Sequence, residues 1–207
     1  FDQADAGLWE FRGRAQLHTY TYLFHWLGGQ TAKKLGLKFS DPSLTQKGES
    51  LMKMASEVIE KAYDEKREVY TQAIGVEALD ASLLQMINWG YLHRKSDKAH
   101  KHLKAMEDNL GTLDGLMYRY KHADDFGLPN TTFLICGFWY VEALANLGYV
   151  EKAHSIFQTL CQTANELGLL SEDVDSQSKQ QWGNFPQCYS HVGLIKAGLA
   201  IEKGASP

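Results

Sequence analysis

Two glutamates far apart in the sequence, Glu10 and Glu172, each lie in a setting that suits acid–base chemistry. Hydrolysis of a glycosidic bond needs two carboxyl groups, one to protonate the leaving oxygen and one to activate a water molecule. Distant parts of a chain can supply this pair when folding brings them to one pocket. If Glu10 and Glu172 face the same pocket, the protein is expected to act on sugars.

Glu10 follows Trp9 and precedes Phe11 in the first of these stretches. Apolar neighbours would desolvate the carboxyl group and favour its protonated form. A general acid needs a proton near neutral pH, so this setting favours that role. The alternative is that Glu10 caps a turn or pairs with Arg12 or Arg14 at the surface.

Glu172 lies in a polar segment that also contains Ser171, Asp173 and Asp175. A more solvated carboxylate remains ionised, as a general base should. Asp173 and Asp175 are competing candidates for this base. The alternative for all three is an acidic surface loop.

Arg119 lies between Tyr118 and Tyr120. Its guanidinium group carries a planar fork of donors that can bind sugar hydroxyls; the alternative is a salt bridge to Asp124 or Asp125. Aromatic side chains can stack on sugar rings, although at least half of them are expected to form core packing instead. The aromatic candidates are Trp9, Trp26, Tyr118, Tyr120, Trp139 and Trp182.

The chain is predicted to be almost entirely helical. Asp41-Pro42-Ser43 opens a helix that runs to about Tyr63, because proline is favoured in the first turn. Two stretches repeat apolar residues on one face only, 98–110 and 151–167. Three stretches are apolar or aromatic on nearly every side and are expected to be buried: 18–27, 81–92 and 131–147. A last helix is expected over 185–202. This alternation favours an all-α toroid, in which outer helices cover inner ones.

Composition narrows the class of protein. The chain has 207 residues, 44% hydrophobic, which is enough for one sizeable core or two small ones. A net charge of -4 gives no basic field, so no nucleic-acid partner is expected, and no apolar run is long enough for a membrane span. The three cysteines lack metal-ligand spacing and are interpreted as free buried thiols. With no signal-peptide pattern, they predict a cytoplasmic protein.

Five blocks, in the expected order, resemble glycoside hydrolase family 15, the glucoamylase and trehalase-like family. Gly7-Leu8-Trp9-Glu10-Phe11-Arg12-Gly13, followed by His18-Thr19-Tyr20, is similar to the general-acid segment of that family. Gly168-Leu169-Leu170-Ser171-Glu172, with Gly183-Asn184-Phe185-Pro186-Gln187 and Ser190-His191, resembles the general-base segment. The three other similar blocks are residues 79–84, 118–120 and 133–139.

The resemblance implies an (α/α)6 barrel and an inverting mechanism, with Glu10 as acid and Glu172 as base, roughly 6.5–9.5 Å apart. It implies no metal or organic cofactor. The substrate-binding residues that it implies are Trp9, Asp80, Arg119 and Tyr120. The substrate would be an α-glucan or another α-glucoside, with glucose released from the non-reducing end. Trehalose hydrolysis by the same family is the alternative, and a non-catalytic helical module is the alternative of another class.

The chain departs from the family pattern in two respects. The helix after the acid has Gln30-Thr31 where the family usually carries an acidic/basic pair. The glycines that precede them, Gly28 and Gly29, cost about 1 kcal/mol each in a helix relative to alanine. The chain also offers about seven helices, whereas the family has about twelve. Residues 1–207, which start at Phe1 rather than Met, are therefore interpreted as the C-terminal part of the catalytic domain. An incomplete barrel would expose an apolar seam, which predicts self-association.

Overall fold

The computed structural model describes residues 3–204 and divides into two compact units, the first ending at Ala78 and the second beginning at Leu79. We call them unit 1 and unit 2. Both are dominated by α-helices, and their few strands have two residues each. The predicted all-α class is therefore confirmed in each unit.

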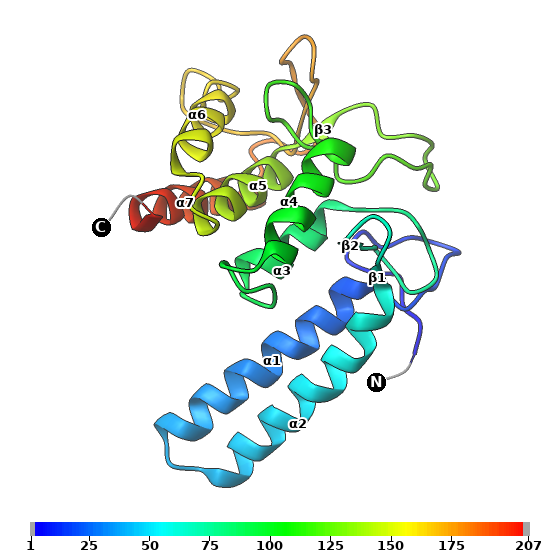
Figure 1. Cartoon of the computed structure of the whole chain (residues 1–207). Helices are drawn as coiled ribbons and strands as arrows, with labels where there is room; N and C mark the ends of the chain where they lie inside the picture. Colours follow the sequence, from blue (N-terminus) through cyan, green and yellow to red (C-terminus); the bar gives the residue numbers. More distant parts are fainter. Residues whose placement is uncertain (1–2, 205–207) are drawn as a thin grey trace. The chain divides into compact units, whose positions relative to one another are not determined.

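Unit 1 is built on an antiparallel pair of long helices, α1 (Thr19–Lys38) and α2 (Pro42–Ile59), drawn in blue and cyan in Figure 1. Asp41 precedes the proline at the start of α2 and accepts a hydrogen bond from the Leu44 backbone N–H at 3.0 Å, so the predicted start is confirmed. Unit 1 ends with η1, β1 and β2, whose bounds are Glu60–Ala62, Tyr63–Asp64 and Val69–Tyr70.

The two helices of unit 1 approach each other closely at glycines. A Cβ atom on Gly29 would lie 2.8 Å from the carbonyl oxygen of Gly48, so neither position has room for a side chain. This contact accounts for a glycine at position 29 of α1 despite its low helix propensity, whereas a Cβ atom on Gly28 would meet nothing within 4 Å. The expectation that the aromatic start of α1 is buried on every side is wrong, because Phe24 is 59% exposed.

Unit 2 is arranged around the buried helix α5 (Leu134–Asn146), against which α6 and α7 pack. Figure 1 shows α5 and α7 side by side along much of their length. The remaining helices of unit 2 are η2 (Ala81–Leu84), α3 (Gln85–Asn88), α4 (Asp97–Leu110), α6 (Val150–Cys161) and α7 (Cys188–Gly204).

Several helices of unit 2 are shorter than their sequence patterns predict. The stretch 81–92 forms only η2 and α3, because Gly90 adopts a φ of +77° and ends the helical path. The stretch 151–167 ends at Cys161, since the side chain of Asn165 accepts hydrogen bonds from two following backbone N–H groups and forms a turn. The spacing of apolar residues alone does not show where these helices end.

A small antiparallel sheet connects the chain before α5 with the chain before α7. Its strands are β3 (Thr132–Phe133), β4 (Asp173–Val174) and β5 (Gln181–Trp182), in that order. Phe133 pairs with Asp173, which in turn pairs with Trp182. The all-helical prediction misses this sheet, which holds the segment that carries Glu172.

Helix α7 presents a stripe of exposed apolar side chains in unit 2. Its members are Tyr189 (64% exposed), Val192 (46%), Ile195 (57%) and Leu199 (60%). Their spacing of three and four residues places them on one face of the helix. The stripe is the kind of surface expected at an apolar seam, and self-association through it stays a prediction. Within residues 3–204, we find no helix with the length and hydropathy of a membrane span.

Candidate active site

Glu10 lies at the end of a tight turn in unit 1. The Glu10 backbone N–H donates to the Gly7 carbonyl at 3.3 Å, and the Phe11 N–H donates to the Ala6 carbonyl at 2.9 Å. Asp5 closes the turn from the other side by accepting a hydrogen bond from the Gly7 N–H at 2.7 Å. These hydrogen bonds fix the turn without any contribution from the Glu10 side chain.

The backbone of Glu10 itself is unusual, with a φ of +54°. Residues other than glycine seldom adopt this left-handed conformation, which is found in turns and is enriched at active sites. The Glu10 side chain is exposed, so the expected desolvation by Trp9 and Phe11 is wrong in this structure. Trp9 is half-buried beside it. Glu10 makes no side-chain hydrogen bond or ion pair with residues 3–204, so the predicted alternative of a pair with a neighbouring arginine is not found either.

Glu172 is anchored much more firmly in unit 2. Its Oε2 atom accepts two hydrogen bonds from Asn184, from the backbone N–H at 3.1 Å and from the side-chain amide at 2.9 Å. Gly183 is packed against the same carboxylate, since a Cβ atom there would lie 2.7 Å from Oε2. The other oxygen, Oε1, has no hydrogen-bond partner among the described residues.

The backbone around Glu172 is held on both sides. Its N–H donates to the Asn184 carbonyl at 2.9 Å, and its carbonyl accepts from the Leu134 N–H at 3.0 Å. Ser190 and His191, in the first turn of α7, bind the two residues that precede it: the Ser190 hydroxyl donates to the Ser171 carbonyl, and His191 Nε2 accepts from the Leu170 N–H. The residues quoted with the general-base block thus lie together in space.

The two competing aspartates occupy different environments. Asp173 is partly buried and accepts a hydrogen bond from the Thr131 hydroxyl at 2.8 Å; burial raises the pKa of its carboxyl group. Asp175 closes the turn between β4 and β5, where hydrogen bonds from the Ser178 backbone and side chain lower its pKa. Asp175 therefore has a structural role in the turn.

Arg119 and Asp173 line the same pocket of about 200 Å³ in unit 2. Arg119 Nη2 lies 3.4 Å from Asp124 Oδ2, so the predicted alternative of a salt bridge to Asp124 is confirmed. Tyr120 donates to the same carboxylate at 2.5 Å, and its burial, followed by this bond, raises the pKa of the phenol. The pocket is completed by a loop of residues 126–131 and by Phe133.

Asp80 is buried and starts η2 by accepting hydrogen bonds from the Ser82 N–H at 2.9 Å and from the Ser82 hydroxyl. Its backbone pairs with that of Tyr120, and the Ala81 N–H donates to the Arg119 carbonyl at 2.8 Å. Asp80 therefore positions the Arg119 segment from behind and is not one of the residues that line this pocket. Trp9 and Glu10 belong to unit 1, and the other predicted site residues belong to unit 2.

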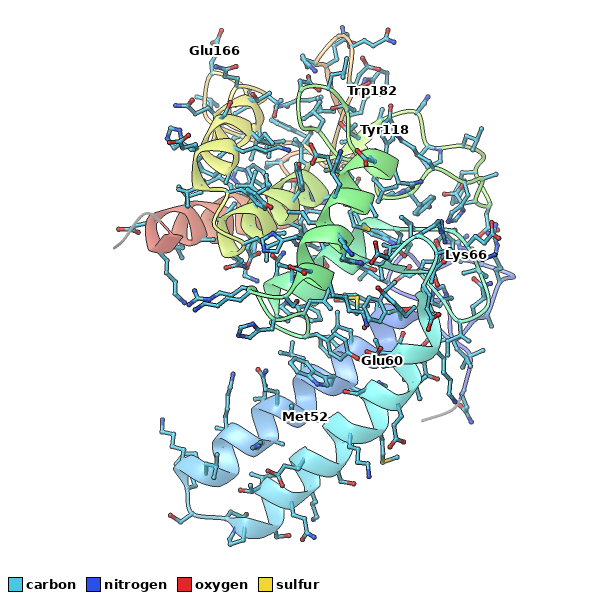
Figure 2. The ribbon with its side chains drawn as sticks, viewed as in Figure 1. Met52, Glu60, Lys66, Tyr118, Glu166 and Trp182 are labelled. Atoms are coloured by element: carbon cyan, nitrogen blue, oxygen red, sulfur yellow. The ribbon has the colours of Figure 1, made fainter. Side chains whose placement is uncertain are left out.

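Sequence reasoning assigned no role to Asn184 or Gly183, and it named Asp124 only as a possible salt-bridge partner of Arg119. The first two were quoted within a family block, and their spacing of eleven and twelve residues from Glu172 gave no sign that they touch it. In Figure 2, the labelled Tyr118 and Trp182 lie among the loops of unit 2, from which this site is built. Among the described residues, no group of three or more His, Cys, Asp or Glu side chains is placed to hold a metal ion. Of the three free cysteines, only Cys136 is buried, so the prediction of buried thiols is wrong for the other two.

Curated relatives match nearly the whole chain. A trehalase of Mycobacterium tuberculosis is 35% identical over 203 residues, which cover 96% of this chain and 30% of the relative. A trehalase of Thermoplasma volcanium is 29% identical over 201 residues, covering 96% of this chain and 32% of the relative. The chain thus spans about a third of the length of these relatives.

Solved structures show a related fold. A glycosidase variant in complex with glucose matches with a TM-score of 0.83 at 18% identity, over 97% of this chain and 56% of the other. A bacterial glucoamylase complexed with acarbose matches with a TM-score of 0.75 at 16% identity, over 94% of this chain and 34% of the other. At these identities the likeness shows the fold alone, and it confirms the predicted class, the (α/α)6 toroid.

The family model of glycosyl hydrolases family 15 matches residues 1–199, which include all five blocks singled out in the sequence. The match also spans both units, from the turn that carries Glu10 to the helix that follows Glu172. The chain therefore belongs to glycosyl hydrolases family 15.

Proposed function

We propose that this chain is the C-terminal part of the catalytic domain of an inverting glycoside hydrolase that releases glucose from the non-reducing end of α-glucosides. Glu10 acts as the general acid and Glu172 as the general base. The observation that carries the proposal is the setting of Glu172. One carboxylate oxygen is fixed by Asn184, while the other is left to bind a water molecule.

The reaction assigns each proton a place. Glu10 gives its proton to the glycosidic oxygen as the bond from that oxygen to the anomeric carbon breaks. Glu172 takes a proton from a water molecule whose oxygen bonds to the anomeric carbon from the opposite face, so the released glucose has the inverted configuration. Exchange with solvent then returns the proton from Glu172 and supplies one to Glu10. Hydrogen bonds from Asn184 hold the Glu172 carboxylate in one orientation before the step.

The pocket of Arg119 and Asp173 is proposed to bind sugar hydroxyls. The guanidinium group supplies donors and the carboxylate supplies acceptors, which together suit a polyol. Tyr120 and Asp80 support this pocket through Asp124 and the Arg119 backbone. Trp9, beside Glu10, is proposed to offer an apolar surface to the sugar ring.

Trehalose is the second candidate substrate. The two relatives compared above are both named trehalase, and one of them is 35% identical, whereas the glucoamylase likeness is at the level of fold. Both substrates contain an α-glucosidic bond, and the same two carboxylates would serve either reaction.

The test is glucose release by the longest polypeptide that contains this sequence, on trehalose, maltose, maltotriose and isomaltose, with the anomer followed by NMR. We expect β-glucose to appear first. Glu10→Gln and Glu172→Gln should each lower kcat by about 10² to 10⁴-fold with the fold retained. Glu166→Gln is the matched control, because Glu166 is exposed and Figure 2 shows it apart from Trp182 and the hairpin after Glu172.

The outcomes separate the candidates. Preferred cleavage of trehalose would identify a trehalase, and preferred cleavage of maltotriose would identify a glucoamylase-like enzyme. First release of α-glucose would overturn the inverting mechanism. Full turnover by either carboxylate variant would remove that residue from the reaction. No release from any substrate by a folded protein would favour the non-catalytic helical module.

A further inference from the structure

We infer that His18 is a positioning residue for Glu10: its buried imidazole ring forms the seat on which the Glu10 turn rests. The inference depends on the acid role of Glu10 proposed above. It adds a residue outside the two carboxylates and the sugar pocket, and it concerns contacts within unit 1 alone.

The fit between Gly7 and His18 is the first support. Gly7 starts the turn that ends at Glu10, and it adopts a φ of +67°. A Cβ atom on Gly7 would lie 2.9 Å from three carbon atoms of the His18 ring. The turn therefore lies directly on the imidazole face, with no space for even a methyl group between them.

Phe11 provides a second contact at the other end of the turn. Its buried ring stacks on His18 with the centroids 5.8 Å apart and the planes 20° from parallel. Glu10 lies between Gly7 and Phe11 in the sequence, so the turn that carries the acid contacts the His18 ring at both of its ends. A displacement of the His18 ring would therefore displace the turn and, with it, the Glu10 carboxyl group.

His18 is itself fixed by its surroundings. It is 2% exposed, it hydrogen-bonds to the Gln72 backbone, and its own backbone pairs with Ala73. Its Nε2 atom is buried without a hydrogen-bond partner among residues 3–204, so a proton there would have nothing to bind. Burial lowers the pKa of His18, although the Asp5 carboxylate and the Gln72 bond act in the opposite direction. The backbone pairing, the bond to Gln72 and the burial of the ring together hold His18 in place beneath the turn.

Two glycines of the same segment provide a matched test. Gly7 and Gly13 have φ values of +67° and +70°, so alanine meets similar backbone strain at both positions. Only at Gly7 does the methyl group strike His18, since nothing lies within 4 Å of the same atom on Gly13. We expect Gly7→Ala to lower kcat on trehalose or maltose by about 10²-fold, the order of loss that a small misplacement of a reacting group produces. Gly13→Ala should retain most of its kcat.

Two variants of the seat complete the series. His18→Phe keeps a flat ring beneath Gly7 and should retain much more activity than His18→Ala, which removes the ring. The readout that separates positioning from general damage is α-glucosyl fluoride, whose leaving group needs little protonation. Gly7→Ala and His18→Ala should lose far less kcat on the fluoride than on the disaccharide, with KM little changed.

Glu10→Gln, assayed in the longest polypeptide that contains this sequence, shows which proposal has failed. Suppose that Glu10→Gln keeps its kcat on the fluoride and loses it on the disaccharide, as an acid should. The role of His18 is then refuted, and the acid role of Glu10 stands, if Gly7→Ala loses kcat equally on both substrates or has the same kcat as Gly13→Ala. If Glu10→Gln turns over the disaccharide normally, the proposed acid itself is refuted. Near-ultraviolet circular dichroism confirms that each variant compared is folded.

Discussion

The two segments that carry Glu10 and Glu172 are held in opposite ways. The Glu10 turn has a left-handed backbone and an exposed side chain that contacts no partner in the described part of the chain. The Glu172 segment is bound to its neighbours along the backbone, and its carboxylate receives two hydrogen bonds from Asn184. One region fixes the backbone and leaves the acid group free, whereas the other fixes the carboxylate itself.

This difference suits the two proposed tasks. The two donors of Asn184 hold the Glu172 carboxylate in one orientation, as a base that must position a water molecule requires. The Glu10 side chain has no such donors and can move to meet the leaving oxygen. The comparison predicts that changes near Glu172 act through the carboxylate and that changes near Glu10 act through the turn.

The largest expected effect tests the base directly. Glu172→Gly should lower kcat on α-glucosides by about 10² to 10⁴-fold. Added azide should restore turnover, because the anion attacks the anomeric carbon without needing a base and forms β-glucosyl azide. Glu10→Gly should gain nothing from azide on the same substrate, because azide gives no proton to the leaving oxygen. If azide restored turnover in both variants, or in neither, the assignment of Glu172 as base and Glu10 as acid would be refuted.

The next effect concerns the stability of unit 2 in acid. His102 is fully buried, its Nε2–H donates to the Leu83 carbonyl oxygen at 3.1 Å, and burial lowers its pKa from 6.5 to about 4. The unfolded chain therefore takes up this proton at a higher pH than the folded chain. The free energy of unfolding should fall as the pH falls from 6.5 to about 4, by about 3 kcal/mol in total.

Urea unfolding near pH 7 and near pH 4 measures this loss. His102→Gln is the control, because glutamine does not titrate and should flatten that part of the pH dependence. An equal loss of stability in the variant would assign the acid sensitivity to other groups, including His18 in unit 1.

A third prediction compares the helix contacts of the two units. In unit 1, Gly48→Ala would place a Cβ atom 2.5 Å from the Lys33 backbone nitrogen and 2.6 Å from the Gly29 carbonyl. Backbone atoms cannot rotate away, so we expect a loss of about 2 kcal/mol of stability. In unit 2, Gly198→Ala meets only Phe157 at 3.6 Å and should be neutral or stabilising by up to about 1 kcal/mol. Thermal unfolding measures both, and equal effects would show that α1 and α2 can separate.

The smallest effect concerns the anchor of the base. Asn184→Ala removes the side-chain donor to Glu172 Oε2 but keeps the backbone donor. A hydrogen bond to a charged group contributes about 1.5 kcal/mol or more, so kcat should fall about tenfold. Gln177→Ala, in the exposed turn after β4, is the control and should leave kcat unchanged. An unchanged kcat in Asn184→Ala would mean that the backbone alone orients Glu172.

Some structural elements could be predicted from residues that lie next to one another in the sequence. The start of α2 could be predicted because Asp41 and Pro42 act within one turn of where they stand. The exposure of Phe24 could not be predicted, because it depends on which face of α1 meets α2, and the first part of α1 is aromatic or apolar on nearly every side. Strands of two residues, such as β3, are too short to show any period.

The site shows the same division. Glu172 could be singled out from its block, yet its anchoring by Asn184 depends on a chain reversal that no spacing reveals. The positive φ of Glu10 was equally hidden, although the flanking Gly7 and Gly13, both left-handed, hint at a tightly turned segment. Residue types indicated the chemistry, and the tertiary contacts determined how each group is presented.

The turn between β4 and β5 has a consequence for how this region can evolve. It is closed by its own residues, with Asp175 binding Ser178, and it is joined to the rest of unit 2 by the contact of Lys179 with Asp114. The contact between Glu172 and Asn184 lies at the other end of this hairpin, beyond the paired strands β4 and β5. Insertions here should lengthen a loop near the base without retuning the base. Natural length variation, and engineered segments meant to select a different leaving group, are therefore best accommodated at this turn.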